Sequence, residues 1–394
     1  MNNVYQIKNA KNAKPIARIL VADRLRKARV AKSMTQADLA TEVQITRQAI
    51  SAFERGSKQP EGVTLSNIAD ALDQPVSYFI GGSFKPFGEF SVRNFRQFGS
   101  STNKRNDKCT VISEWVAATA AYISESINFP EPNIPVIAPP EEGYFYNDQE
   151  IEDAADLTRK LWGLGFGPID NLVKLLESKG IFISNLQIID EKVNAFSYWC
   201  GDKPLIVTSA KNTTAVRRRF DLAHELGHLV LHQGVSEEDL SEPKTLKRIE
   251  AEANKFAGAF LMPKASYMNE VFSTRLDSFV ELKRRWKVSV AGQVYRCSSL
   301  GIFTDHQVLN LRKQISFKKW RTKEPLDDKM VVEEPSVINK ATKMALDGGA
   351  ISLEHMRSQL GFSNAIIGEI TGIDFSESEI STVLEPLLRI KKEL

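Results

Sequence analysis

Five prolines fall within residues 130–140, and this run limits the possible folds of the chain more than any other feature. Proline lacks a backbone N–H and restricts its φ angle, so a run of this density forms neither a regular helix nor a central strand. We therefore expect a connector there. It separates two patterns along the 394 residues, a helical one before the prolines and a mixed one after them.

Before the prolines, apolar residues recur at helical spacing in several short stretches between residues 16 and 79. They predict a compact all-α domain over 16–82 that ends at Gly81-Gly82. The basic, Ser- and Asn-rich stretch 91–108 is expected to be a flexible connection, and a helix should follow at about 111–126. Residues 83–150 are thus interpreted as a linker with one helix and the proline-rich connector.

After the prolines, a helical pattern over 151–179 ends at Gly180 and leads into the apolar run 181–183. Residues 195–200 and 205–207, separated by Gly201-Asp202-Lys203, predict a hairpin. A long helix should begin near Thr213. We expect a multidomain protein: an all-α domain, then an α+β core with a small sheet over 151–271, and a mostly helical region over 272–394 that serves as a sensor or partner surface or extends the core.

The segment His224-Glu225-Leu226-Gly227-His228 lies within an apolar helical pattern. Residues four apart share a helix face, so both imidazoles can reach one Zn²⁺ at about 2.0–2.1 Å. Glu225 lies beside them and can take a proton from a zinc-activated water that attacks a peptide carbonyl. The pattern predicts zinc ligands at His224 and His228 and a catalytic base at Glu225. Two histidines on an ordinary helix are the alternative interpretation.

A third protein ligand is expected on another element, because a catalytic zinc keeps three protein ligands and one open position. The helical pattern from 250 onward offers Glu250 and Glu252, and helical phase favours Glu250, which shares a face with Asn254. Asn254 would then support the ligands by hydrogen bonding. We expect a packing or supporting role for His232, one turn beyond His228. A solvated acidic helix face is the alternative.

Near the N-terminus, two short helices are expected on either side of Gln44-Ile45, with Thr35 capping the first. In a helix-turn-helix the first residues of the second helix meet base edges, and Arg and Gln suit guanine and adenine. The expected base-facing contacts are Gln36, Arg47, Gln48 and Ser51. The expected phosphate contacts are Lys58, Arg55 and Lys32. A helical domain used only for dimerisation or protein contacts is the alternative.

Two strings, RRRFDLAHELGHLVLH over 217–232 and IEAEANKFAGAFLMP over 249–263, resemble the ImmA/IrrE metallopeptidase family. The similarity extends over roughly residues 150–300. It implies a zincin-like fold, Zn²⁺ as cofactor, Glu250 as the third ligand, and cleavage of specific protein partners, often repressors. In zinc peptidases the substrate lies along a sheet edge, a role that the hairpin 195–207 is a candidate for.

The stretch 35–73, TQADLATEVQITRQAISAFERGSKQPEGVTLSNIADALD, resembles the Cro/cI-type helix-turn-helix (XRE) family, and the similarity covers about residues 20–80. It implies binding to a double-stranded DNA operator. Gln44 occupies the turn position that this family usually gives to glycine, so we expect a non-glycine residue in a left-handed turn.

Composition agrees with a DNA partner and an intracellular location. Residues 1–82 carry 12 Lys and Arg against 7 Asp and Glu, an excess that an anionic partner would favour. No run of eighteen apolar residues occurs, and the N-terminus lacks the apolar core of an export signal. The three cysteines lie far apart, as is usual in a reducing compartment. We expect a cytoplasmic protein with no membrane span.

Three functions follow from these features. The first is a DNA-binding regulator with an active zinc endopeptidase that cleaves a protein partner such as a repressor or antitoxin, or the chain itself. The second is a non-proteolytic repressor or antitoxin-like factor that uses the zincin fold as a sensor or interaction module. Nucleic-acid processing is disfavoured, because no carboxylate cluster suited to two metals accompanies the histidines. A palindromic operator would require a homodimer.

Overall fold

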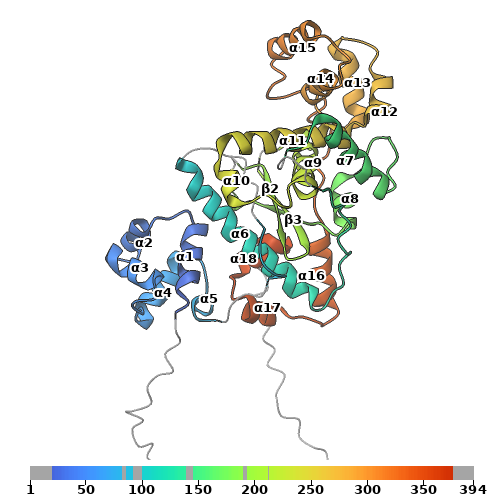
Figure 1. The fold of residues 1–394 in the computed structure, drawn as a ribbon. Coiled ribbons are helices and arrows are strands. Elements are labelled where there is room, and N and C mark those ends of the chain that lie inside the picture. Colours follow the sequence, from blue (N-terminus) through green and yellow to red (C-terminus); the bar gives the residue numbers. More distant parts are fainter. Residues whose placement is uncertain are drawn as a thin grey trace, which may run out of the picture.

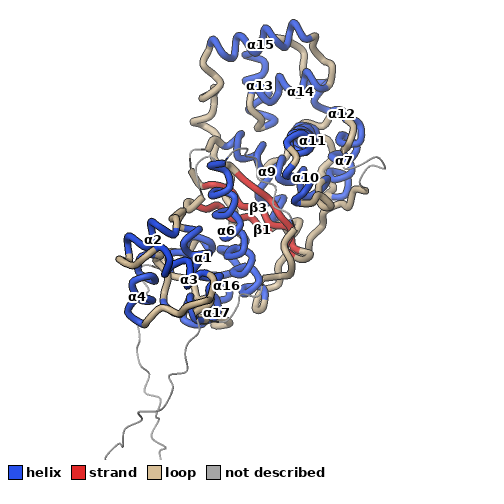
Figure 2. The backbone as a smooth tube through the Cα atoms, turned by 60° about the vertical axis from the view of Figure 1, so that its left-hand side comes forward, coloured by secondary structure: helices blue, strands red, loops and turns tan. Residues whose placement is uncertain are grey.

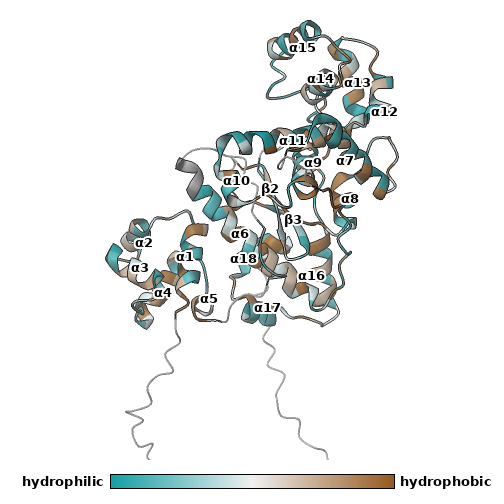
Figure 3. Cartoon of the chain, viewed as in Figure 1, coloured by the Kyte–Doolittle hydropathy of each residue, from teal (hydrophilic) through white to brown (hydrophobic). Residues whose placement is uncertain are grey.

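The computed structural model describes residues 20–81, 86–91, 100–138, 145–189, 193–211 and 213–375. It has the predicted fold class: a helical N-terminal region, a small three-stranded sheet, and a mostly helical C-terminal region (Figure 1). Both colours of the hydropathy scale appear along most helices, as expected for helices with one buried face (Figure 3). Within the described residues, no helix has the length and apolar character needed to cross a membrane.

Five short helices form the N-terminal region where the apolar spacing predicted them. Thr35 and Asp38 cap α2 reciprocally, and Thr46 caps α3 through the N–H of Ala49. Between these helices Gln44 has a φ of 54°, so the left-handed turn forms without glycine. The helices are α1 (Ala22–Ala31), α2 (Gln36–Glu42), α3 (Arg47–Glu54), α4 (Gly62–Ala71) and α5 (Val76–Ile80).

Helix α6 (Ser100–Ser124) begins inside the stretch expected to be a flexible connection, so that prediction is wrong from Ser100 onward. The C-terminal half of α6 carries large buried side chains, Trp115 among them. Packing holds this half of α6 in the helical conformation, so the costly nucleation of the helix is already complete. The polar residues before it, such as Asn, Lys and Arg, then extend an existing helix, which costs little free energy. Residues 126–138 contain no helix or strand, as the prolines predicted.

The sheet has the strand order β1-β3-β2, with β1 (Phe182–Leu186) parallel to β3 (Lys203–Ser209) and β2 (Ala195–Cys200) antiparallel to it. The predicted hairpin is therefore present, and β2 is an edge strand. Side chains alternate between two cores along the strands: Leu205 and Val207 lie in one, and Ile206 lies in the other. Helices cover both faces (Figure 2).

One face of the sheet packs against the helices that carry the histidine motif. Helix α9 (Ala215–Leu231) contacts β2 and lies against α11 (Pro243–Leu261), which also packs on α7 (Asp148–Leu161). The rest of this core comes from further helices: α8 (Leu172–Ser178), α12 (Lys264–Tyr267), α13 (Leu276–Trp286), α14 (Val290–Ser299) and α15 (Asp305–Phe317). The short helix α10 (Glu237–Ser241) packs on α11, and the 3₁₀ turn Met268–Glu270 follows α12.

The region beyond residue 272 divides between the two cores, a division that the sequence did not reveal. Helices α13–α15 extend the core of the histidine motif, whereas α16 (Val337–Asp347), α17 (Leu353–Leu360) and α18 (Asn364–Thr371) return to the other face of the sheet and to α6. There Phe362 packs on Tyr78 of α5 and on Trp115 of α6. The N-terminal helices therefore share one continuous core with the sheet.

The return of the chain is held by buried carboxylates at helix N-termini. Glu333 forms a buried ion pair with Arg219 of α9 and accepts the N–H groups of Leu172 and Val173 at the start of α8. Glu177, at the other end of α8, accepts the N–H of Val337 at the start of α16. Helix α9 is thus directly connected to the segment that leads into α16.

Candidate metal centre and nucleic-acid interface

Helix packing brings His224, His228 and Glu250 together. The Nε2 atoms of the two histidines lie 3.0 Å apart, and each lies 3.4 Å from a carboxylate oxygen of Glu250. Three ligand atoms at about 2.0–2.1 Å from one tetrahedral zinc would be about 3.3–3.4 Å apart. The spacing therefore suits a zinc ion. The fourth position has no candidate among the described His, Cys, Asp and Glu side chains, as a catalytic site requires.

Two hydrogen-bond chains orient both imidazoles so that their Nε2 atoms point to the shared metal position. Nδ1 of His224 lies 3.1 Å from Oδ1 of Asn254, so Nδ1 carries the proton and donates. Nδ1 of His228 lies 3.0 Å from Nδ1 of His232, whose Nε2 lies 3.2 Å from Oε2 of Glu252. An ionised carboxylate only accepts, so His232 donates from Nε2 and accepts from His228 at Nδ1. Both ligand histidines then present an Nε2 lone pair.

Close helix packing makes this convergence possible. Gly227 lies between the two histidines, and a Cβ there would be 3.2 Å from the Cα of Ala253 on α11. A side chain at Gly227 would keep α9 away from α11 and Glu250 away from the imidazoles.

Glu225 lies beside the ligands on α9 and is 1% exposed. Its Oε2 accepts a hydrogen bond of 2.8 Å from the hydroxyl of Ser197, which is buried on the edge strand β2. The Ser197 hydroxyl therefore fixes the orientation of the carboxylate.

Burial and charge set the protonation of the surrounding groups. Burial raises the pKa of Glu250, but the adjacent imidazoles of His224 and His228 outweigh it and hold this pKa far below its usual range. Burial lowers the pKa of His232 well below 6.5, and the neighbouring histidines act in the same direction. His232 is therefore neutral, as the hydrogen-bond chain requires. Burial raises the pKa of Glu252 to about 7, so the ionised form that accepts the hydrogen bond from His232 predominates above this pH.

Two residues of this arrangement were missed from the sequence. Helical phase correctly turned Glu252 away from the ligand face, but the residue meets His232 instead. Ser197 offered only a faint signal, as the one aliphatic hydroxyl in the apolar and aromatic strand 195–200. Both contacts join distant segments, so the sequence did not bring these residues together.

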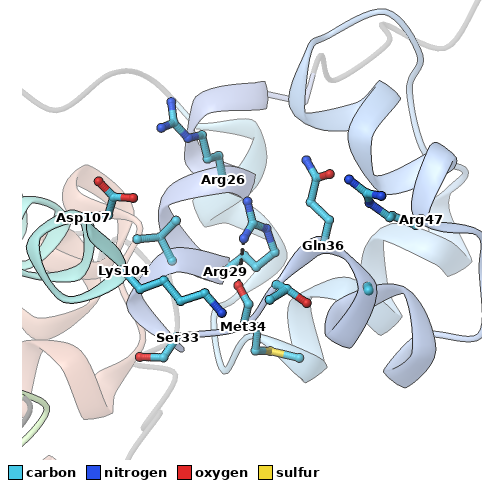
Figure 4. Close-up of a pocket in the computed structure, with 11 residues that line it drawn as sticks. Arg26, Arg29, Ser33, Met34, Gln36, Arg47, Lys104 and Asp107 are labelled. Carbon is cyan, nitrogen blue, oxygen red and sulfur yellow. Dashed lines mark hydrogen bonds between the residues drawn. The ribbon is translucent and has the colours of Figure 1, made fainter. Parts of the chain in front are cut away.

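The predicted DNA contacts gather at the N-terminal ends of α2 and α3. Arg47 and Gln48 are exposed in the first turn of α3, and Ser51 follows one turn on and is half-buried. Lys58 is exposed in the turn after α3. Figure 4 shows Gln36 and Arg47 side by side. This is the placement that a recognition helix needs to present side chains to the major groove.

Some of these side chains already have protein partners. Gln36 donates a hydrogen bond of 2.8 Å to Glu54, whose carboxylate is also paired with Arg29. Lys32, expected at a phosphate, forms an ion pair with Asp73. Gln36 is thereby held in position at the start of α2.

Comparisons with known proteins found family matches for both the helix-turn-helix region and the region that contains the histidine motif. Residues 176–298 match the family model of the IrrE N-terminal-like domain, a peptidase family, and residues 25–79 match a helix-turn-helix family model. Over 63 residues, 16% of this chain, the sequence is 38% identical to YqaE of Bacillus subtilis (strain 168), named as an uncharacterized HTH-type transcriptional regulator. The match covers 54% of that protein, so the chain spans about half the length of this relative.

Both resemblances seen in the sequence are thereby confirmed. The helix-turn-helix match coincides with α1–α5, and the IrrE-like match contains the sheet, α9 and Glu250. The chain therefore joins a DNA-binding domain of the XRE-type helix-turn-helix family to a metallopeptidase-like domain of the IrrE/ImmA family.

Proposed function

We propose that this protein is a cytoplasmic transcriptional regulator that binds a double-stranded DNA operator and carries a zinc-dependent endopeptidase for a specific protein partner, such as a repressor. The observation that carries the proposal is the convergence of His224, His228 and Glu250 beside Glu225, with the Nε2 lone pairs of both histidines directed at one point. Zinc ligation by these three residues and base catalysis by Glu225 belong to the proposal.

Bound zinc would supply a Lewis acid that acidifies water and polarises the peptide carbonyl. Glu225 takes one proton from the attacking water, whose oxygen forms a bond to the carbonyl carbon. The carbon–nitrogen bond breaks as Glu225 passes this proton to the leaving amine. Ser197 holds one Glu225 oxygen throughout, and the buried surroundings strengthen the electrostatics of these steps.

The edge of β2 is the proposed docking strand for an extended substrate, because Ser197 on this strand contacts Glu225. The far end of this edge pairs with the chain itself: Ser91 donates to the carbonyl of Trp199, and Gly201 donates to the carbonyl of Glu89. A substrate would therefore pair with the part of β2 nearer to the metal.

The test compares the wild type with Glu225→Gln and His224→Ala, and uses Glu238→Gln, an exposed position on α10, as the matched control. We expect about one zinc ion per chain in the wild type. Glu225→Gln should keep the zinc and slow cleavage by about 10²- to 10⁴-fold, whereas His224→Ala should lose both. Metal analysis and cleavage of proteins co-expressed from its own genetic neighbourhood are the measurements. Normal cleavage by Glu225→Gln would refute the mechanism.

The second candidate function is a non-proteolytic repressor or antitoxin-like factor in which the zincin fold is a sensor or interaction module. It is favoured by the closure of the site, since His224, Glu225 and His228 are at most 2% exposed. Zinc binding without cleavage of any neighbouring protein would support this function over the first.

A further inference from the structure

A hollow lies between the helix-turn-helix helices and α6. Its wall is built by the end of α1, the start of α2, the first residue of α3 and one turn of α6 (Figure 4). Four of its lining side chains are cationic and one is acidic: Arg26, Arg29, Arg47, Lys104 and Asp107. Lys104 and Asp107 come from α6, which lies outside the helix-turn-helix match.

Of the four cationic side chains, one is neutralised by an ion pair within the protein, and the other three can interact with a bound anion. Arg29 is neutralised by Glu54, with Nε to Oε1 at 2.5 Å and Nη2 to Oε2 at 2.9 Å. Arg26, Arg47 and Lys104 are exposed and have no ion pair among the described residues. The hollow therefore keeps a net positive charge even with Asp107 in its wall, which is the arrangement that attracts an anion.

The side chain of Lys104 lies near the start of α2, the first helix of the helix-turn-helix. Hydrogen bonds with Thr35 lower the pKa of Asp38 at the start of α2, and the charges of Lys104 and Arg29 lower it further. Figure 4 shows the Lys104 ammonium directed into the hollow, toward Ser33 and Met34, with Gln36 and Arg47 on the far side.

Helix α6 is fixed to the helix-turn-helix region rather than loosely tethered. Lys27 of α1 forms an ion pair of 2.8 Å with Glu114 of α6, and Trp115 packs on Tyr78 of α5. The position of Lys104 relative to the recognition helix is therefore set by packing. DNA that seats Arg47 and Gln48 in the major groove would place its backbone beside the start of α2, where Lys104 lies.

We propose that Lys104 of α6 binds a backbone phosphate of the operator, so that the DNA-binding surface extends beyond the helix-turn-helix onto a helix of the peptidase-bearing body. The inference rests on the proposed DNA-binding function. Asp107, in the same hollow, opposes this contact and limits its strength. A phosphate contact carries no sequence information, so Lys104 contributes affinity at every site and Arg47 and Gln48 contribute the preference among sites.

The experiment measures binding of the full-length protein to a fluorescein-labelled duplex of mixed sequence, by anisotropy, at several salt concentrations between about 50 and 200 mM. The variants are Lys104→Ala, Lys104→Arg and Asp107→Asn. Lys313→Ala, an exposed lysine on the remote helix α15, is the matched control. A double variant, Arg47→Ala with Gln48→Ala, tests the helix-turn-helix itself. DNA sequences that the wild type prefers are first selected, and the preference of the double variant among them is then compared with that of the wild type.

Lys104→Ala should weaken binding about three- to tenfold and reduce the slope of log affinity against log salt by about 0.9, the value for one phosphate contact. Lys104→Arg should keep the slope. Asp107→Asn should strengthen binding about two- to threefold, because it removes a repelling charge. Lys313→Ala should match the wild type.

Two results would overturn the inference, and they differ in what they say about the proposed function. If Lys104→Ala and Lys313→Ala bind alike while the Arg47 and Gln48 variant loses sequence preference, the helix-turn-helix binds DNA without α6. If the wild type binds no duplex at any salt concentration, the proposed DNA-binding function fails and the inference fails with it.

Discussion

At the scale of single residues, the metal centre depends on side chains that never touch the metal position. His232 accepts a hydrogen bond from Nδ1 of His228 and donates one from its Nε2 to Glu252, so these two residues hold His228 in the tautomer whose Nε2 carries a lone pair. Asn254 does the same for His224. Groups that orient metal ligands in this way typically change metal affinity or activity by about 10- to 100-fold when removed.

We predict that His232→Ala weakens zinc binding by about 10- to 100-fold, because His228 loses the partner that fixes its tautomer. Competition against a chelator of known affinity measures the effect. The neighbouring Gln233→Ala is the control, since Gln233 is exposed and its side chain, within the described residues, bonds only to the backbone carbonyl of Leu229 in α9. Equal affinities in the two variants would show that the His232 contact does not support the ligand.

At the scale of elements, the approach of α9 to α11 decides whether Glu250 can join the histidines. The two helices lie close together at Gly227, where a Cβ would be 3.2 Å from a backbone atom of Ala253 and from the ring of Phe256. Gly258, on α11, has more room: a Cβ there would meet only the Arg296 side chain, at 3.7 Å. The two glycines therefore allow the same substitution to be compared in two environments.

We predict opposite effects of alanine at these two positions. Gly227→Ala should destabilise the fold by about 1–3 kcal/mol through overpacking and should lower zinc affinity as the helices separate. Gly258→Ala should be neutral or stabilising by about 0.5–1 kcal/mol, because alanine favours the helix. Thermal unfolding of the metal-free chain and chelator competition are the measurements. A Gly227→Ala variant with wild-type zinc affinity would argue against close packing as the requirement.

At the scale of the whole molecule, helices α16–α18 join the DNA-binding region to the sheet. Phe362, just after α17, is fully buried between Tyr78 of the helix-turn-helix region and Trp115 of α6, at ring-centroid distances of 6.2 and 5.4 Å. Ser363 also donates a backbone hydrogen bond of 3.1 Å to Gln74. The two ends of the described chain therefore meet in one core, and neither domain is packed independently of the other.

We predict that Phe362→Ala lowers the free energy of unfolding by about 3–5 kcal/mol through the cavity it leaves. Zinc content should stay at the wild-type level, since the ligands lie on the opposite face of the sheet. Phe317→Ala is the control: this ring is 89% exposed, and its loss should change stability by less than about 0.5 kcal/mol. Denaturant unfolding measures both. Equal stabilities would mean that Phe362 does not join the two regions.

The sequence by itself determined the features that depend on nearby residues. The cap at Thr35, the left-handed turn at Gln44, the hairpin and the pairing of His224 with His228 all follow from residues close together in the sequence. Motif resemblance identified both domains and selected Glu250, because each motif lies within a short continuous string. These predictions needed no knowledge of which distant segments meet.

Only the tertiary structure decided the contacts between distant segments. It placed Ser197 against Glu225, Glu252 against His232, and Lys104 beside the recognition helix. It also returned residues 333–375 to the sheet and extended α6 to Ser100. The physical reason is that these arrangements depend on how buried faces pack, and an apolar face specifies that it must be covered but not which helix covers it.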